Sequence, residues 1–111
     1  MKDTEKQLRK GVLDILILKL ISEKDMYGYE LMKFLEEKSR GYYTLKEGSL
    51  YPVLYRLEDS LLIENYPGEA TGKRSVPRKY YKITDRGLEA VLMHKKQWDL
   101  FVESSNYIIG E

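Results

Sequence analysis

The side chains best suited to bind another molecule occupy two short stretches of this 111-residue chain. Ser49, Tyr51 and Tyr55 carry hydroxyl groups that can hydrogen-bond to a base edge or to a phosphate oxygen. Further along, residues 72–82 contain five basic side chains and no acidic one: Lys73, Arg74, Arg78, Lys79 and Lys82. A local basic cluster of this kind is typical of phosphate binding, and the alternative is a solvated polar loop.

Residues 48–60 are predicted to form the helix that presents the hydroxyl groups. Pro52 lacks an amide hydrogen, so a regular helix should not begin much before Gly48. Ser49 and Tyr51 then lie near a helix N-terminus, where amides and the helix dipole favour a phosphate. The apolar residues recur at helical spacing and should pack inward: Leu50, Val53, Leu54, Leu57 and Leu61. The alternative is an ordinary core helix with two incidental tyrosines.

No grouping of residues in the sequence is typical of an enzyme. The stretch from Gly68 to Lys73 approaches a phosphate-loop pattern, but it is one residue short and Arg74 replaces the Ser or Thr that would hold magnesium. His94 is the only histidine and has no partner at the spacing of a zinc site or a catalytic triad, so a solvated position is expected. We therefore expect no catalysis, no metal and no cofactor.

Composition indicates a single small domain. The chain has no cysteine, which suits a reducing cytoplasm, and its net charge of +1 argues neither for nor against nucleic acid. The longest apolar run, residues 12–21, is interrupted by Asp14 and Lys19 and is shorter than the ~20 residues that span a membrane. We expect a cytoplasmic protein with no membrane association.

The elements before the presenting helix are predicted to be helical. Residues 1–23 should form a helix that is apolar nearly all round over residues 12–21, so that it contacts a partner chain as well as its own core. Asp25 is the predicted N-cap of a second helix over residues 26–38, which Gly41 ends. Residues 42–45 suit either a small strand or an extended link.

Residues 62–66 and 78–83 are predicted to be the two strands of a β-hairpin with a long basic tip. Two helices followed by such a hairpin predict an α+β, mainly α fold: a winged helix-turn-helix over residues 1–83. The helix would then enter a groove of DNA while Lys73, Arg74, Arg78 and Lys79 contact phosphates.

Residues 84–111 are predicted to form a C-terminal dimerisation helix with Thr84 as N-cap. Its apolar stripe should pair with the first helix of a second chain. The alternative is that the helix folds back on its own domain. Trp98 would be packing, or one half of an aromatic slot for a flat apolar ligand. The predicted interface residues are Val12, Ile15, Leu16, Leu88, Val91, Leu92, Trp98, Phe101 and Val102.

Three blocks of sequence, at residues 27–31, 48–58 and 78–87, together resemble the PadR family of bacterial transcriptional regulators. The resemblance covers about residues 10–90, with Tyr27 where the family usually has histidine and Ser60 where it often has glycine. It implies a homodimeric winged-helix repressor that a small molecule releases from DNA. The brief C-terminal part resembles the short subfamily, in which some members bind planar drugs between paired tryptophans, and this implies a ligand role for Trp98.

The sequence thus predicts a sequence-specific transcriptional regulator that binds a pseudo-palindromic DNA site as a homodimer. Two alternatives remain open. One is a protein-interaction module, because residues 46–61, which include the presenting helix, contain two bases and three acids and are therefore slightly acidic. The other is a small-molecule sensor whose DNA binding is incidental.

Overall fold

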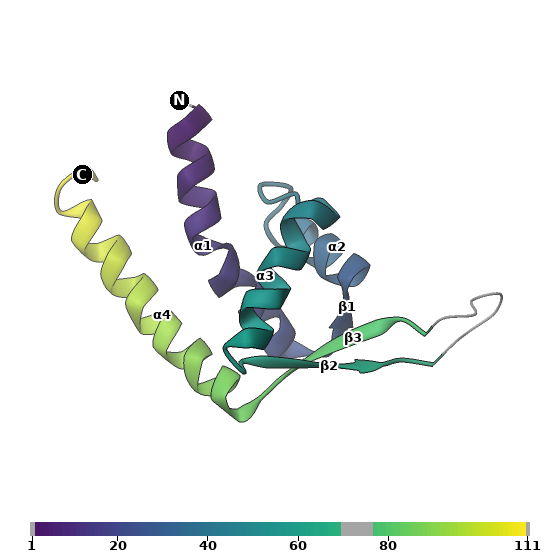
Figure 1. Ribbon diagram of the computed structural model, residues 1–111. Coiled ribbons are helices and arrows are strands. Elements are labelled where there is room, and N and C mark those ends of the chain that lie inside the picture. Colours follow the sequence, from purple (N-terminus) through teal and green to yellow (C-terminus); the bar gives the residue numbers. More distant parts are fainter. Residues whose placement is uncertain (1, 70–76, 111) are drawn as a thin grey trace.

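The computed structural model describes residues 2–69 and 77–110. The described elements are α1 (Lys2–Glu23), β1 (Met26–Tyr27), α2 (Gly28–Lys38), α3 (Glu47–Asp59), β2 (Ile63–Pro67), β3 (Lys79–Ile83) and α4 (Asp85–Asn106). Figure 1 shows α1, α2 and α3 gathered over a small sheet, with the β2–β3 hairpin extending to one side and α4 to the other. The predicted α+β, mainly α class is confirmed.

The three strands form an antiparallel sheet in the order β1-β3-β2. The central strand β3 pairs through Tyr81 with Met26 of β1, and through Ile83 with Ile63 of β2. Because β3 has a neighbour on each side, Tyr81 is carried into the core, where it is 1% exposed. The hairpin is the wing of the predicted fold, and its described base is continuous with the core.

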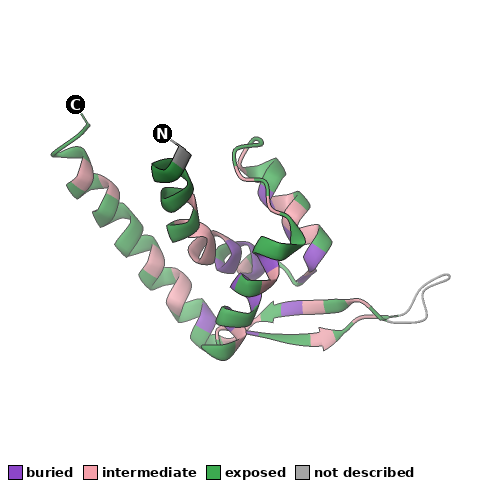
Figure 2. Cartoon of the chain, turned by 45° about the horizontal axis from the view of Figure 1, so that its top comes forward, coloured by how far each residue is buried: buried purple, intermediate pink, exposed green. Residues whose placement is uncertain are grey.

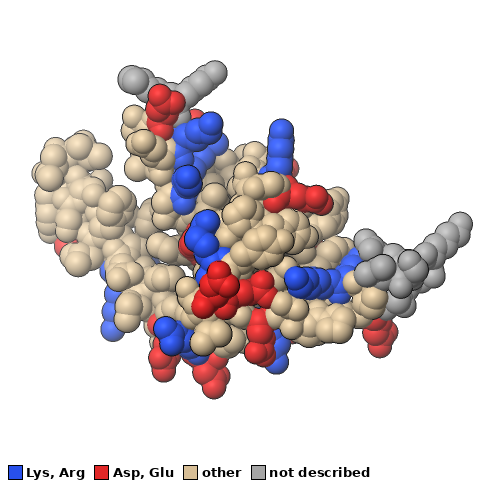
Figure 3. Space-filling view, viewed as in Figure 1, with Lys and Arg blue, Asp and Glu red and all other residues tan. Residues whose placement is uncertain are grey.

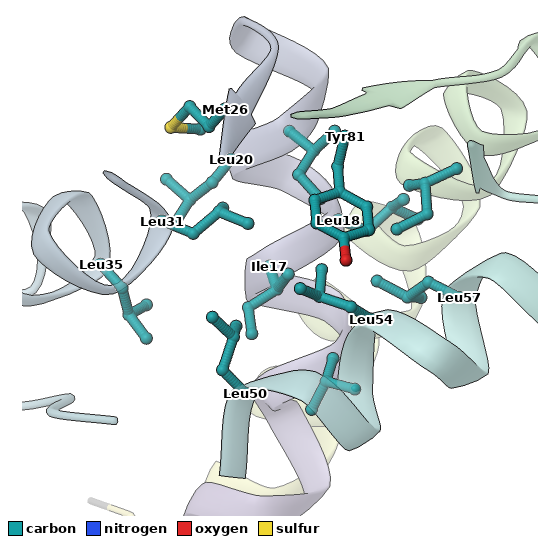
Figure 4. Close-up of a cluster of buried hydrophobic side chains, with 13 residues drawn as sticks. Ile17, Leu18, Leu20, Met26, Leu31, Leu35, Leu50, Leu54, Leu57 and Tyr81 are labelled. Atoms are coloured by element: carbon teal, nitrogen blue, oxygen red, sulfur yellow. The ribbon is translucent and has the colours of Figure 1, made fainter. Parts of the chain in front are cut away.

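The hydrophobic core lies where the second half of α1 meets α2, α3 and the sheet. Figure 4 shows side chains from all of these elements converging on one cluster, with Leu18 and Leu54 fully buried. In Figure 2 most buried residues lie in this region, with Gly87 at the start of α4 also buried, whereas the start of α1 and most of α4 are exposed. The buried apolar residues are Ile17, Leu18, Leu20, Ile21, Met26, Leu31, Leu35, Leu50, Val53, Leu54, Leu57, Ile63 and Tyr81.

The predicted start of the second helix at Met26, with Asp25 as N-cap, is wrong. Met26 and Tyr27 pair with β3 as a short strand, and α2 begins at Gly28 with Tyr27 as N-cap. The Glu30 carboxylate accepts a hydrogen bond from the Tyr27 amide at 3.3 Å, which satisfies one of the unpaired N–H groups at this end. Sheet pairing of buried Met26 thus outweighs the local preference for helix. Residues 42–45 form no strand and link α2 to α3 without regular structure.

The Thr84 N-cap of α4 is confirmed. Its hydroxyl accepts the Gly87 amide at 3.0 Å and donates to the Leu61 carbonyl at 2.7 Å. Gly87 packs so closely that an added Cβ would lie 2.1 Å from the Leu62 carbonyl oxygen. These contacts fix the direction in which α4 leaves the sheet. None of the helices within the described residues is long and apolar enough to cross a membrane.

Candidate nucleic-acid interface

One side of α3 faces away from the protein. Leu50, Val53, Leu54 and Leu57 bury the opposite side, so the helical period leaves Ser49, Pro52 and Tyr55 exposed. Tyr55 is 52% exposed. The helix starts at Glu47 after Lys46, which provides no side-chain cap, and the Ser49 and Leu50 amides donate to the Lys46 carbonyl at 3.0 Å. The negative charge of the Glu47 carboxylate in the first turn offsets the attraction that the free amides of this helix end would have for a phosphate.

Tyr51 and Tyr55 are neighbours on α3, with ring centroids 6.1 Å apart, but they differ in their surroundings. Tyr51 is half-buried and its hydroxyl lies against the start of α2, where a Cβ added at Gly28 would be 2.6 Å from it. Gly28 therefore makes room for Tyr51. Of the two tyrosines predicted to reach a groove, Tyr55 is exposed and Tyr51 is half-buried.

Arg56 lies beside Ser49 and Pro52 on α3 and was not among the predicted contacts. Its Nη2 and Nε donate to the two carboxylate oxygens of Asp14 in α1, at 2.8 and 3.1 Å. The hydrogen bonds and charge of Asp14 raise the pKa of Arg56 above its ordinary value. Arg56 belongs to the polar side of its helix in the sequence, but a partner 42 residues away cannot be identified from a local pattern.

The base of the wing carries two of the predicted phosphate contacts. The guanidinium of Arg78 stacks over the Tyr27 ring, 4.4 Å from its centroid, and the ammonium of Lys79 lies 5.9 Å from the Tyr81 ring. Tyr80 packs edge-on against Tyr27 with centroids 5.4 Å apart. Arg78 and Lys79 are thereby brought to one end of the sheet, while Lys73 and Arg74 lie outside the described residues.

A hydrogen bond from Tyr66 to Asp25 ties the outer strand of the wing to the loop before β1. The phenol oxygen lies 2.6 Å from the carboxylate, and this bond, followed by desolvation, raises the pKa of Tyr66 to about 12. The Tyr66 ring also stacks on Tyr80 at 5.7 Å. The wing base is therefore held by side chains from β1, β2, β3 and the loop at Asp25.

Charges on this face are mixed. Figure 3 shows acidic and basic side chains interspersed over α3 and the sheet, with Lys and Arg also present near the wing. Several are paired: Lys82 lies 3.6 Å from Glu64 across the strands, and Asn65 donates to Glu58. The interface is therefore not a uniformly basic surface, and its recognition would depend on where individual cations lie.

A second candidate site lies between α1 and α4. Two hollows of about 320 and 650 Å³ open there, and Val12, Ile15 and Trp98 line both. Trp98 is 40% exposed and lies 6.0 Å from Phe101, while Leu92 is 68% exposed. Among the other predicted interface residues, Leu88 is exposed, and Leu16 and Val91 pack partly against their own core.

The expectation that His94 is solvated is wrong. The residue is half-buried at the smaller hollow, and its Nδ1 is buried with no hydrogen-bond partner in the structure. Within residues 2–69 and 77–110, no group of three His, Asp or Glu side chains could hold a metal ion. The hollows are thus lined mainly by apolar and aromatic side chains.

Comparison with known proteins agrees with this geometry. The PadR-like family of transcriptional regulators matches residues 17–92. Transcriptional regulator YqjI of Escherichia coli (strain K12) is 31% identical over 93 residues, which cover 84% of this chain but only 42% of that protein. A transcriptional regulator from Clostridium thermocellum superposes with a TM-score of 0.83 at 33% identity, over 93% of this chain and 95% of that chain. A PadR-like transcriptional regulator from Bacillus cereus gives 0.77 at 37% identity, over 95% and 98%.

Proposed function

The chain belongs to the PadR-like family of transcriptional regulators, which are DNA-binding proteins and not enzymes, and on that premise we propose that it is a sequence-specific repressor. In this proposal it acts in the cytoplasm, binds a pseudo-palindromic operator as a homodimer, and is released by a small molecule. Residues 1–83 bind DNA and residues 84–111 dimerise.

The observation that carries the proposal is the exposed side of α3. A helix whose inner side is fixed by four buried residues presents Ser49 and Tyr55 rigidly, and Arg78 and Lys79 lie at the base of the wing. Hydroxyl groups on the helix suit base edges, and the wing cations suit phosphates. Tyr51, Lys73 and Arg74 complete the proposed contacts.

A second copy of the chain is the proposed cover for α4. Apolar side chains are exposed along α4 at Leu88, Leu92 and Phe101. A monomeric protein is not expected to leave this much contiguous apolar surface in water. Pairing this surface with Val12 and Ile15 of the partner would place two α3 helices on one side of the dimer. Half-sites about 34–36 Å apart would then be read in successive major grooves.

The hollows beside Trp98 support release by a ligand. They offer apolar walls and one large aromatic ring, which suit a planar apolar or aromatic molecule. Because α1 lines these hollows and also packs on α3, a ligand seated there would act on the helix that contacts DNA.

The test is selection of duplexes from a random library by the full chain, followed by fluorescence anisotropy over a salt titration. Enrichment of an inverted repeat that binds far more tightly than a shuffled duplex, with affinity falling steeply with salt, supports the proposal. Equal weak binding to both duplexes would refute sequence-specific regulation. Binding that is absent at all salt concentrations would favour a protein-interaction module, for which the acidic residues Glu47 and Asp59 on α3 are the supporting observation.

A further inference from the structure

We propose that Arg56 contacts a DNA phosphate at the edge of α3, and that Asp14 of α1 is the positioning residue that orients its guanidinium for that contact. This inference rests on the proposed function. It adds one cation and one carboxylate to the proposed interface.

The geometry leaves part of Arg56 available. A guanidinium has five N–H groups in a fixed plane, and Asp14 accepts from Nε and from one N–H of Nη2. The two Nη1 hydrogens and the second Nη2 hydrogen have no partner in these bonds. Because the Arg56 side chain is 53% exposed and Asp14 35% exposed, this unused edge faces water rather than the core.

The position of Arg56 on the helix suits a backbone contact. It follows Ser49 by seven residues and Pro52 by four, so the three lie along one stripe at the side of the exposed face. Residues at the side of a helix in a major groove lie close to the phosphates that border the groove. The other basic residue of the segment, Lys46, lies at the opposite end of α3.

The ion pair between Arg56 and Asp14 has a more defined geometry than a contribution to folding stability would require. Exposed ion pairs contribute little to folding, and the other Lys and Arg pairs in the described part of the chain use a single nitrogen atom. Lys95 also donates to both carboxylate oxygens of Asp99, but from one nitrogen. Arg56 differs because two of its nitrogen atoms, Nε and Nη2, each donate to a separate oxygen of Asp14, which fixes the plane of the guanidinium as well as its place. Such fixing lowers the entropy lost when a phosphate binds.

Asp14 also relates the two candidate sites. Its neighbours on α1, Val12 and Ile15, line both hollows between α1 and α4. A ligand that moved this turn of α1 would therefore move the carboxylate that orients Arg56. The pair thus joins the turn of α1 that lines the hollows to the exposed side of α3.

The test compares four variants of the full chain on the selected duplex and on a shuffled one. Arg56→Gln should weaken binding to both and reduce the slope of log affinity against log salt by about 1, because one phosphate contact is lost. Arg56→Lys should keep the slope but weaken both duplexes several-fold, because an ammonium cannot be held in one plane. Asp14→Asn should keep the slope and weaken binding to both duplexes several-fold, since the arginine remains charged but is less well oriented toward the phosphate.

Lys38→Gln is the matched control. It removes one cation from an exposed pair of similar length, 2.7 Å to Glu23, at the far ends of α1 and α2, and the salt slope should not change. Thermal melting checks that each variant is folded. An unchanged slope in Arg56→Gln would overturn the phosphate contact, and an Asp14→Asn variant that binds both duplexes equally more tightly would show that Asp14 only repels DNA. Failure to select any duplex would instead refute the proposed function itself.

Discussion

Replacing Gly87 with alanine should detach the start of α4 from the sheet. The added Cβ would lie 2.1 Å from the Leu62 carbonyl oxygen, whereas ordinary contacts begin at 3.4 Å, so one backbone must move by about 1.3 Å. The same carbonyl accepts the Thr84 amide at 3.1 Å, and this bond would be strained too. Overpacking lowers the free energy of unfolding by about 1–3 kcal/mol, and loss of the hydrogen bond lowers it by about 1 kcal/mol. The higher helix propensity of alanine raises it by at most about 1 kcal/mol.

The net destabilisation of Gly87→Ala is therefore about 1–3 kcal/mol, which corresponds to a fall in Tm of about 5–20 °C for a domain of this size. Gly48→Ala is the matched control, because Gly48 also lies in the first turn of a helix and a Cβ there meets nothing within 4 Å. Thermal melts at one fixed protein concentration measure both, since a dimer makes Tm depend on concentration. A Gly87→Ala protein that melts with or above the wild type would refute the close packing on which this reasoning depends.

The cap of α4, the Tyr66–Asp25 hydrogen bond and the exposed side of α4 can each be tested by substitution. Thr84→Ala should lower stability by about 1 kcal/mol by removing the cap of α4, whereas Thr84→Ser should retain most of it in denaturant titrations. The pKa of Tyr66 is raised to about 12 in the folded state, so its hydrogen bond to Asp25 stabilises the protein fully below pH 10 and is lost as pH rises towards 12. Tyr66→Phe should remove one tyrosine that titrates late in an ultraviolet pH titration. An unchanged titration curve would contradict this assignment. Leu92→Asp should halve the mass in sedimentation equilibrium at a concentration where the wild type is dimeric, and an unchanged mass would exclude this side of α4 from the interface.

Local signals in the sequence predicted those elements whose ends depend on local chemistry. Thr84 caps the residues that follow it, and Pro52 limits where α3 begins, so both boundaries were anticipated closely. Met26 and Tyr27 were misassigned because their strand depends on pairing with Tyr81 and Tyr80, more than fifty residues away. A short apolar segment carries no local mark of such a partner.

The site residues divide in the same way. Helical spacing separated Tyr51 and Tyr55 from the core, but only the position of Gly28 decides that Tyr51 is half-buried and Tyr55 exposed. The burial of His94 likewise depends on α1 passing beside it, and no local pattern indicates the spacing between α1 and α4. Residue type was informative about chemistry, whereas burial and pairing required the fold.

The start of α2 relates the two proposed DNA contacts to each other. Tyr51, in the second turn of α3, packs on Gly28, while Arg78 at the base of the wing stacks on Tyr27. Because Tyr27 and Gly28 are adjacent residues, α3 and the base of the wing pack on the same short segment of the chain. We therefore propose that residues 27–31 hold α3 and the base of the wing at the spacing at which both would contact one duplex.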